Sequence, residues 1–304
     1  MAPPIIRRML DRLQRLELQG SRYCFDEIIR DQENIVVAKN MDDLDELSLK
    51  AAEGLRSFSS FLEGVPVVVS EKVSGTKLED DIVYTRYKLP VVTRRTLEKL
   101  IGGSDEPLVY VTKGGVYVRI KGEELRKVRD EKGISRGELA RALGVSRRTI
   151  LYYEKGLSDA SLQVALKMEE YIGDRVFARL SLEELKGLVK EPARRGAPGE
   201  RIRDTALKRL LNVLAAMGFK EYLFSRTPFD AGAKRKPQRE ARLLIRGEGG
   251  EEEDIEEILE VTDSKAILLT ESGGVEEEER VLVLPRERVG EIKKHISLLF
   301  DTDN

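Results

Sequence analysis

The chain has 304 residues, enough to bury two or three hydrophobic cores. Charged residues make up 36% of the sequence, yet the formal net charge is only −2, so the chain as a whole is not a basic nucleic-acid coat. Cys24 and His295 are the single cysteine and the single histidine. This excludes an intrachain disulfide, a Cys/His zinc site and, unless His295 takes part, a Ser-His-Asp triad.

Further classes are excluded by what the sequence lacks. No apolar run approaches the roughly 20 residues of a membrane-spanning helix, and no signal peptide is present, so we expect a cytoplasmic protein without a membrane partner. No glycine-rich phosphate loop supports a nucleotide, and we expect no cofactor and no bound metal. The absence of tryptophan and the many ion-pairing residues favour a thermophilic host.

Residues 1–106 predict an α/β domain. An amphipathic helix through residues 6–16 opens it, and the aromatic–acid pair Phe25-Asp26 follows. The remaining elements alternate between apolar strands and amphipathic helices: strand 35–38, helix 44–62, strand 65–69, strand 89–92 and helix 94–101. Buried apolar strands that alternate with helices indicate a parallel or mixed sheet.

Residues 107–120 predict a β-hairpin that connects this domain to the next one. Apolar residues alternate on both sides of Lys113-Gly114-Gly115, where the glycines permit a tight turn. We expect the hairpin to pack on the first helix of the following domain. It would then fix that domain rigidly to the N-terminal one.

Residues 135–156, SRGELARALGVSRRTILYYEKG, predict two short helices joined by a tight turn. Ser135 and Glu138 form an S-x-x-E capping box, Gly144 supplies the left-handed residue of the turn, and Ser146 caps the second helix. The apolar positions that face inward are Leu139, Ala140, Leu143, Ile150 and Tyr153. This spacing predicts a helix-turn-helix whose second helix enters the major groove of DNA.

The charges of this segment fit contact with DNA. Five basic and two acidic side chains give the motif a local net charge of +3, and local charge determines the electrostatic footprint. The predicted base contacts, at and after the cap of the second helix, are Ser146, Arg147, Arg148, Thr149 and Tyr152. The predicted phosphate contacts are Arg136, Arg141 and Lys155. The plainer alternative is a helical bundle that mediates protein contacts only.

Residues 122–173 resemble the DNA-binding domain of the XRE (Cro and phage-repressor) family. The similar parts are the helix GEELRKVRDEKG, the turn ALGVS, the tail YYEKGLSDAS and the helix LQVALKMEEYIG. That family often has glutamine at the start of its second helix, where the side chain braces the recognition helix and touches phosphate. Arg136 stands there, and we expect it to favour phosphate contact over bracing. With a short helix at 181–189, the domain extends over residues 121–188.

The remainder of the chain predicts a linker and a second, shortened α/β domain. Residues 189–204, VKEPARRGAPGERIRD, are a charged linker whose arginines (194, 195, 201 and 203) suit solubility or, less simply, contact with a phosphate backbone. Residues 205–304 repeat the element order of the N-terminal domain. Corresponding positions include Phe25 with Phe229, a shift of 204, and Val67 with Ile267, a shift of 200.

The order of elements in both flanks resembles that of restriction-endonuclease-like nucleases, in which an Asp and a D/E-x-K triplet on adjacent strands hold Mg²⁺. Asp26 and Lys39 would play two of these parts, but Val37 occupies the position of the second acid. The second copy keeps Asp230, while its strand 243–246 has no acid and ends in arginine. We therefore expect two restriction-endonuclease-like α/β domains, both without catalytic activity, on either side of an all-α helix-turn-helix bundle.

The arrangement of the whole chain resembles a family of archaeal helix-turn-helix transcriptional regulators. The resemblance rests on FDEIIRDQENIVVAKN, LEDDIVYTRYKLPVVT, the hairpin YVTKGGVYVRI and the complete helix-turn-helix. It implies DNA-binding transcriptional regulation, and it supplies neither an operator nor a small-molecule effector. Since one helix-turn-helix buries little surface, we expect a homodimer on double-stranded DNA, with the α/β flanks as candidate dimerisation surfaces.

Three alternatives remain open from the sequence. The first is a metal-dependent nuclease, which Mg²⁺-dependent cleavage that is lost with Asp26→Ala would reveal. The second is an antitoxin-like or scaffolding protein, which a stoichiometric protein partner would favour. The third, a ligand-responsive switch with one flank as its sensor, would refine the regulator without replacing it.

Overall fold

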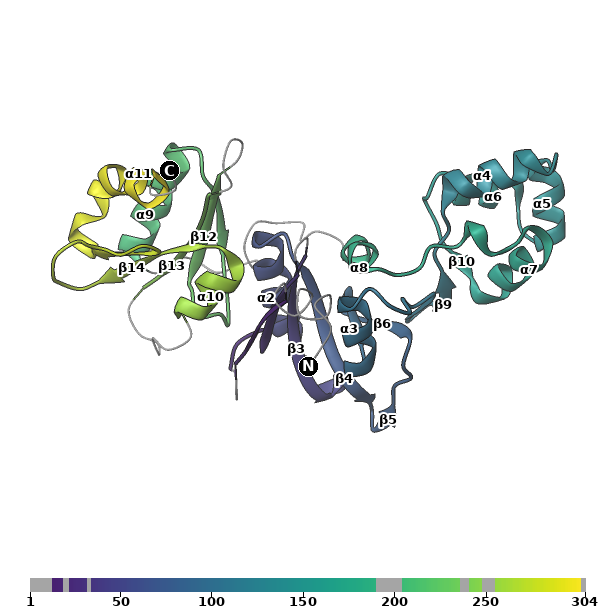
Figure 1. The fold of residues 1–304 in the computed structure, drawn as a ribbon, viewed down its shortest axis with the longest axis horizontal. Helices are drawn as coiled ribbons and strands as arrows, with labels where there is room; N and C mark the ends of the chain where they lie inside the picture. The colour runs from purple at the N-terminus through teal and green to yellow at the C-terminus, as the bar shows by residue number, and fades with distance from the viewer. Residues whose placement is uncertain are drawn as a thin grey trace, which may run out of the picture. The chain divides into compact units, whose positions relative to one another are not determined.

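The computed structural model describes residues 13–18, 22–31, 34–189, 204–235, 241–247 and 255–301 (Figure 1). Residues 190–203 of the predicted linker and most of the predicted helix 6–16 lie outside these residues. The chain divides into two compact units. The first contains Met1–Asn40, Leu47–Val67 and Lys190–Asn304, and the second contains Met41–Glu46 and Val68–Val189.

The N-terminal part of the first unit is built on antiparallel strands and one helix. Its elements are β1 (Gln14–Glu17), β2 (Glu27–Arg30), the first part of β3 (Ile35–Asp43), α2 (Leu49–Phe61) and the start of β4 (Val65–Val73). The prediction that the first helix reaches Leu16 is wrong. Leu16 is the buried residue of a short strand with exposed neighbours, and this strand pairs antiparallel with β2. An alternation of period two over so few residues was mistaken for one turn of a helix.

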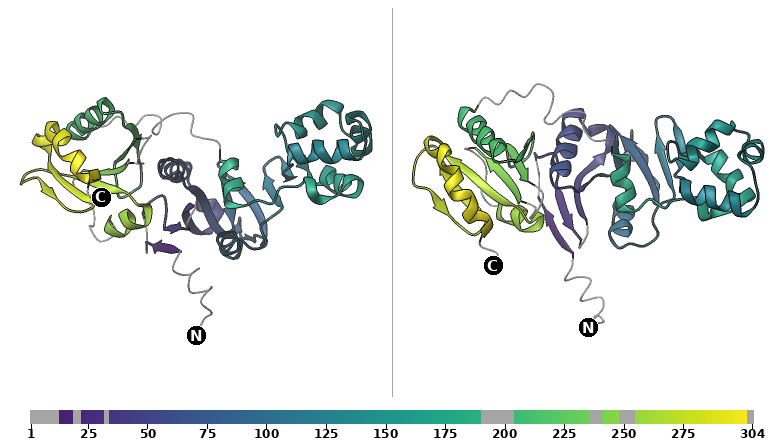
Figure 2. Two further views of the ribbon diagram at one scale, coloured as in Figure 1. Left: turned by 45° about the horizontal axis from the view of Figure 1, so that its top comes forward. Right: turned by 90° about the horizontal axis from the view of Figure 1, so that it is seen from above.

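The C-terminal part of the first unit has a six-stranded sheet. Its elements are α9 (Thr205–Ala216), β11 (Lys220–Leu223), β12 (Ala231–Arg235), β13 (Ala241–Arg246), α10 (Ile255–Thr262), β14 (Lys265–Thr270), β15 (Glu276–Glu277), β16 (Val281–Pro285), the 3₁₀ helix η3 (Arg286–Glu291) and α11 (Ile292–Asp301). The strand order is β11-β12-β13-β14-β16-β15. Side chains of α9 and α11 share one apolar core with the sheet, and the two helices lie on the same side of it (Figure 2).

The last helical segment of this part changes its winding along its length. It starts as a 3₁₀ turn, and the α-helix follows only from Ile292. A 3₁₀ turn places residues three apart on one side, so Val289 and Ile292 are both fully buried. The helix is therefore real, but its first turns have a tighter winding.

The second unit contains the rest of β3 and β4 and all elements up to α8. These are β5 (Thr76–Lys77), β6 (Ile82–Arg86), β7 (Leu89–Val92), α3 (Arg94–Ile101), β8 (Val109–Thr112), β9 (Gly115–Val118), α4 (Gly122–Glu131), α5 (Arg136–Leu143), α6 (Arg147–Glu154), β10 (Ala160–Ser161), α7 (Leu162–Ile172), η2 (Asp174–Val176) and α8 (Leu182–Leu188). Among the residues that the structure describes, no helix is long and apolar enough to cross a membrane.

The predicted hairpin belongs to a sheet. The order of the larger sheet is β1-β2-β3-β4-β7-β6-β8-β9-β10, with β5 paired to β4. Strand β8 runs parallel to β6, and β9 pairs with the short strand β10 just before α7. Val118 and Ile120 enter the apolar core of the helical bundle together with Leu125 of α4. The hairpin thus shares backbone hydrogen bonds with the sheet on one side and with the bundle on the other.

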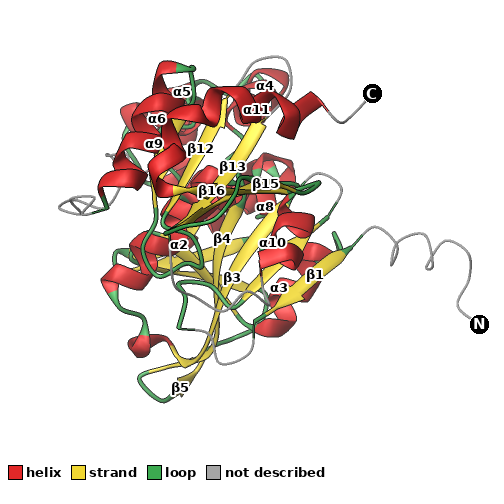
Figure 3. Cartoon of the chain, turned by 90° about the vertical axis from the view of Figure 1, so that its left-hand side faces the viewer, coloured by secondary structure: helices red, strands yellow, loops and turns green. Residues whose placement is uncertain are grey.

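The two sheets have the same strand order up to their sixth strand. Each starts with two antiparallel pairs, β1-β2-β3 and β11-β12-β13. Each then has a helix, α2 or α10, followed by a parallel pair, β4-β7 or β14-β16. An antiparallel pair, β6-β7 or β15-β16, completes the series. Red helices alternate with these yellow strands in Figure 3.

Candidate nucleic-acid interface

The first helix of the motif begins with the predicted capping box. The Ser135 hydroxyl accepts a hydrogen bond from the Glu138 N–H at 3.1 Å, and the Glu138 carboxylate accepts one from the Ser135 N–H at 2.8 Å. The second bond holds the pKa of the Glu138 carboxyl below its ordinary value. Two amide groups that would otherwise lack partners are satisfied at the start of α5, which confirms the prediction.

The turn between the two helices also has the predicted geometry. Gly144 lies in the left-handed region with φ 70°, and the Val145 N–H donates to the Ala140 carbonyl at 2.9 Å. Val145 is half-buried and packs on the core of the bundle. Ser146 then caps α6, because its Oγ accepts a hydrogen bond from the Thr149 N–H at 3.0 Å. A left-handed residue is tolerated here because glycine has no Cβ.

Helix α6 separates an apolar face from a polar one. Ile150 is 0% exposed and Tyr153 is 4% exposed, so both predicted inward positions lie in the core. Ser146, Arg147 and Arg148 are exposed at the start of the helix. Thr149 and Tyr152 are half-buried, and Arg141 and Lys155 are exposed. Four of the five predicted base-contacting residues thus lie at the start of α6, and Tyr152 lies about one turn further along the helix.

Arg148 and Tyr152 form a pair on the outer side of this helix. The Arg148 Nε donates to the Tyr152 hydroxyl at 2.6 Å, and the guanidinium carbon lies 5.1 Å from the ring centroid. This distance is typical of a cation–π interaction, and the two residues lie about one helical turn apart on α6. The contact limits the rotamers of an otherwise long and flexible cation, which reduces the entropy that the side chain would lose on binding.

A buried carboxylate holds three helices of the bundle together. The side chain of Glu154 is only 2% exposed, and it accepts hydrogen bonds from Arg129 Nε at 2.7 Å and Arg136 Nε at 2.6 Å. Arg129 comes from α4 and Arg136 from the first turn of α5, while Glu154 ends α6. A buried charge is tolerated when it is paired and hydrogen-bonded in this way. The network therefore fixes α6 against both α4 and α5.

This network corrects the expectation for Arg136. The sequence argument favoured phosphate contact over bracing, and the structure shows the bracing contact with Glu154. The Arg136 side chain nevertheless remains 34% exposed. The guanidinium has five N–H donors, so the bond through Nε leaves the Nη groups available for other acceptors. A phosphate contact by the same side chain stays a prediction.

Close packing at Gly122 positions the first helix of the bundle. A Cβ at this glycine would lie 2.5 Å from the Glu154 carbonyl oxygen and 2.6 Å from that of Tyr153. The start of α4 therefore rests directly on the last turn of α6. The amide end of one helix meets the carbonyl end of another, which is a favourable arrangement of their dipoles.

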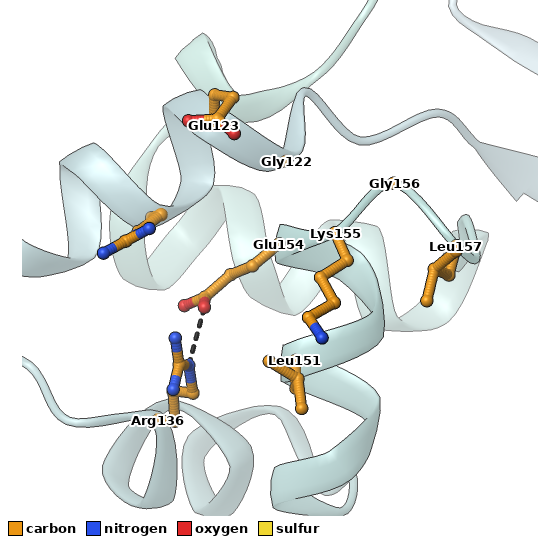
Figure 4. A pocket seen from close by; sticks show the side chains of 9 residues that line it. Gly122, Glu123, Arg136, Leu151, Glu154, Lys155, Gly156 and Leu157 are labelled. Atoms are coloured by element: carbon orange, nitrogen blue, oxygen red, sulfur yellow. Dashed lines mark hydrogen bonds and ion pairs between the residues drawn. The ribbon is translucent and has the colours of Figure 1, made fainter.

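A pocket of about 560 Å³ opens between α4, α5 and the end of α6 (Figure 4). Its lining residues are Gly122, Glu123, Arg126, Arg136, Leu151, Glu154, Lys155, Gly156 and Leu157. Figure 4 shows Arg136 directed at Glu154, with the Lys155 side chain on the other side of that carboxylate. Three cations against two carboxylates, one of them shared by Arg129 and Arg136, favour an anionic ligand at the mouth of this pocket.

The segment after α6 is tied to the hairpin. Tyr110 of β8 donates its hydroxyl hydrogen bond to the Asp159 carboxylate at 2.7 Å, and Arg119 Nε lies 3.7 Å from the same carboxylate. Burial raises the pKa of Tyr110, and the bond to Asp159 acts in the same direction. These contacts add side-chain bonds to the pairing of β9 with β10.

The sequence argument missed Arg129, Glu154 and Gly122. Glu154 lies four residues after the buried Ile150 and directly after the buried Tyr153, on the inward side of α6. Helical periodicity would have placed it there. The need for Gly122 arises from a contact between distant parts of the chain, and no local signal reveals it.

The site that resembles a nuclease centre is occupied by its own side chains. Lys39 Nζ lies 2.8 Å from Asp26 Oδ1, and the Asn40 N–H donates to Asp26 Oδ2 at 2.8 Å. Val37, at the position of the second acid, is 0% exposed. Among the described residues, no group of three or more His, Cys, Asp or Glu side chains is placed to hold a metal ion.

Two family models match the chain. Residues 5–107 match a PD-(D/E)XK superfamily domain, and residues 125–173 match a helix-turn-helix. The two matches identify the class of the protein, a helix-turn-helix protein with a nuclease-like N-terminal domain. They confirm the resemblance of the first flank and of the motif to these families.

The relatives extend over most of the chain. An HTH-type transcriptional regulatory protein of Archaeoglobus fulgidus is 31% identical over 294 residues, which cover 91% of this chain and 88% of that protein. Those of Methanocaldococcus jannaschii and Pyrococcus horikoshii are 29% and 28% identical and cover 90% and 97% of this chain, with 85% and 93% of their own lengths matched. The chain therefore belongs to the family of archaeal HTH-type transcriptional regulatory proteins.

One solved structure, the SinR protein/SinI protein complex, is also similar to part of the chain. It is 21% identical, and the match covers 33% of this chain and 82% of that chain with a TM-score of 0.17. A structural agreement of this size carries no argument about this protein.

Removing the carboxylate of Glu154 tests the bracing network. We expect Glu154→Ala to reduce the free energy of unfolding of the bundle by about 1.5–3 kcal/mol, because the buried Arg129 guanidinium loses a charged hydrogen-bond acceptor and keeps only Asp130 and the Ile134 carbonyl. Urea unfolding measures the loss, and amide exchange of α4, α5 and α6 assigns it to this domain. Glu170→Ala, at an exposed glutamate of α7, is the control and should change stability by less than about 0.5 kcal/mol. Equal stability of the two variants would contradict the bracing role.

Proposed function

We propose that the chain regulates transcription by reading specific DNA sequences with α6 in the major groove. The observation that carries this proposal is the pair of exposed arginines, Arg147 and Arg148, at the start of a helix that the Glu154 network holds in place. A structural bundle has no need of two adjacent cations directly after a serine cap. A helix of this exposure and charge has the properties of a recognition helix.

In this proposal, different side chains at the start of α6 contact different groups on the bases. Arg147 and Arg148 are suited to bidentate hydrogen bonds with guanine O6 and N7. Thr149 can meet a base edge or a thymine methyl group, and Ser146 contacts a base from the cap position. Tyr152, which already orients Arg148, reaches a flanking base or phosphate. The contact with Tyr152 thus orders the Arg148 guanidinium before DNA binds.

Phosphate contacts surround this reading surface. Arg136, Arg141 and Lys155 lie on α5 and at the end of α6, and two of them line the pocket next to Glu154. Contacts of this kind hold the register of the protein on the duplex and do not depend on the base sequence. Arg136 both braces α6 and contacts phosphate: its Nε donates to Glu154, while its remaining N–H groups donate to the DNA backbone.

Two copies of the chain act together on a two-fold site in this proposal. A single helix-turn-helix buries too little DNA for high specificity, so two helix-turn-helix motifs are expected about one turn of the DNA helix apart. Each such motif is called a reader below. The flanking α/β part does not cleave DNA. Its acid at Asp26 is neutralised by Lys39, and the second metal-binding carboxylate is replaced by Val37.

Capture of host DNA tests the reading helix. Fragmented genomic DNA is bound to the parent chain, to an Arg147→Ala/Arg148→Ala variant and to the control Arg175→Ala, whose arginine pairs with Glu124 and Glu131. We expect the parent and the control to enrich a few upstream sites with inverted half-sites, and the double variant to lose them. Each lost bidentate arginine should cost about 1–3 kcal/mol. Equal recovery by all three chains would overturn the proposal, and a stoichiometric protein partner would then favour a scaffold.

Salt dependence separates the two roles of Arg136. We expect Arg136→Gln to weaken binding to all sequences alike and to reduce the slope of log K against log salt concentration by about 1, because one phosphate contact is lost. Glutamine can still donate to Glu154, so the bracing contact is retained in part. Arg175→Gln is the matched control and should leave the slope unchanged. A slope that Arg136→Gln does not alter would show that this side chain only braces.

Incubation with Mg²⁺ tests the inactive flank. We expect no cleavage of supercoiled plasmid DNA by the parent chain, because the metal would have one carboxylate where the chemistry needs at least two. Linear or nicked products would contradict this if Asp26→Ala abolishes them and Asp42→Ala, at an exposed aspartate of β3, does not.

A further inference from the structure

Two parts of the first unit contact each other through reciprocal bonds. The N-terminal lobe comprises the described residues between 13 and 40 and between 47 and 67, and the C-terminal lobe comprises those between 204 and 301. Lys234 of β12 donates to the Phe61 carbonyl at the end of α2 at 3.3 Å. Arg30 of β2 donates to the Val261 carbonyl near the end of α10 at 3.3 Å. Each lobe thus supplies a cation to the helix end of the other.

The same two cations also reach an acid of the opposite lobe. Lys234 Nζ lies 2.8 Å from Glu63 Oε1, and Arg30 Nη2 lies 3.9 Å from Asp263 Oδ2. Glu63 and Asp263 both follow the end of their helix, and both have a left-handed backbone, with φ 56° and φ 50°. The cations are separated by 204 positions in the sequence, and the acids by 200. These shifts are the ones that the sequence repeat gives for Phe25 with Phe229 and for Val67 with Ile267.

The helix ends that receive the cations are built alike. The Glu63 N–H donates to the Ser60 carbonyl at 3.3 Å and the Gly64 N–H to the Ser59 carbonyl at 2.8 Å. At the second helix end, the equivalent bonds run from Asp263 to Glu260 at 3.2 Å and from Ser264 to Leu259 at 3.0 Å. Both pairs of bonds are related by a shift of 200. An unpaired helix carbonyl attracts a cation, so each end offers the same target.

The backbone around the aspartates repeats as well. The Asp26 N–H donates to the Ala38 carbonyl at 2.8 Å, and Asp230 donates to the Ile245 carbonyl at 2.9 Å. The carboxylates accept from the amides two residues further on, Asn40 at 2.8 Å and Gly247 at 2.7 Å. The correspondence therefore extends from the strand order to individual hydrogen bonds.

Apolar contacts fill the space between the reciprocal bonds. Phe224 meets Phe58 and Phe61 edge-on, with centroids 5.3 Å and 5.4 Å apart. Glycines permit the close approach: a Cβ at Gly232 would lie 2.7 Å from the Phe61 ring, and one at Gly54 would lie 2.7 Å from the Ser225 carbonyl oxygen. Helix α2 contacts β11, and α10 contacts β1 and β2, so the helix of each lobe lies against the strands of the other (Figures 1 and 2).

From these contacts we infer that the two lobes are diverged copies of one module and form an isologous dimer within a single chain. In an isologous interface, residue i of one copy meets residue j of the other and j meets i, as Arg30, Lys234 and their targets do. Modules on two different chains would pair through this same surface. Here the other lobe of the same chain already occupies it. Two chains that meet on DNA must use a different surface, which replaces the expectation that these flanks dimerise with those of another chain.

The single cysteine reports whether the lobes are in contact. Cys24 is 0% exposed, its N–H donates to the Arg226 carbonyl of the C-terminal lobe at 2.6 Å, and burial raises the pKa of its thiol to about 12. A thiol reagent at about pH 8 reaches it only when the lobes separate. We expect Lys234→Ala to accelerate labelling about 30-fold, because the Glu63 carboxylate and the Phe61 carbonyl both lose their contact with the lysine of the other lobe.

Two matched variants make this measurement decisive. Arg30→Ala should also accelerate labelling, and by a smaller factor, because its side chain is 34% exposed whereas that of Lys234 is 5% exposed. Lys293→Ala, at an exposed lysine of α11, should leave the rate unchanged. The inference is overturned if all three variants label at the rate of the parent chain.

A cut chain tests the interface without any substitution in it. A protease recognition site placed between Val189 and Asp204 allows the folded, full-length chain to be cleaved into two fragments. We expect the fragments to co-elute in equal amounts at micromolar concentration, and Lys234→Ala to raise their dissociation constant about 30-fold. Fragments that separate in the cut parent chain would overturn the inference. Neither experiment contains DNA, so the result does not depend on the proposed function.

Discussion

The buried carboxylate of Glu154 is the interaction on which the DNA reader depends. It sits at the end of α6 and is 2% exposed, which is affordable only because Arg129 and Arg136 both donate to it. The carboxylate joins α4, α5 and α6 at one point, and the close packing at Gly122 excludes any other seating of α4 on α6. The orientation of the exposed arginines at the other end of α6 follows from this arrangement.

Local rules predicted the helix-turn-helix well, and they did not predict what long-range contacts decide. Ser135, Glu138, Gly144 and Ser146 act on neighbours within a few residues, so their roles can be read from spacing alone. Arg136 was assigned to phosphate because its partner is 18 residues away, and nothing local indicates that partner. Gly122 and Gly232 are glycines because backbone or rings from distant segments occupy the place of a Cβ. In the flanks, the alternation of strands and helices was sufficient for the element order, whereas four residues of β1 were too few to distinguish a strand from a helical turn.

Asp26 and Asp230 of the flanks have a structural role that does not depend on catalysis. The Asp26 carboxylate accepts a hydrogen bond from the Asn40 N–H, and the Asp230 carboxylate accepts one from the Gly247 N–H. Each aspartate also donates its own N–H to the carbonyl two residues before that amide, that of Ala38 or Ile245. Replacing either one would remove the acceptor of the hydrogen bond from Asn40 or Gly247. The same residue that would hold a metal in a nuclease therefore has a structural role here. This gives the first acid of the pattern a role in both copies, although the second acid is missing from both: Val37 stands at its position in the first copy, and strand 243–246 of the second copy has no acid.

A two-fold axis inside the chain changes what the flanks can contribute to DNA binding. Two identical subunits on an inverted repeat share one axis with the DNA, so every surface on the axis is self-complementary. In this chain the self-complementary surface of the flanks is already closed by Arg30, Lys234 and the phenylalanines between them, and the chain has one helix-turn-helix for two lobes. The axis of the lobes and the axis of an inverted repeat then cannot be the same axis. In the proposed pairing of two chains on DNA, the surface that joins them therefore lies outside this closed interface. The helical bundle and the hairpin that precedes it offer such surfaces, and neither has a counterpart in the C-terminal lobe.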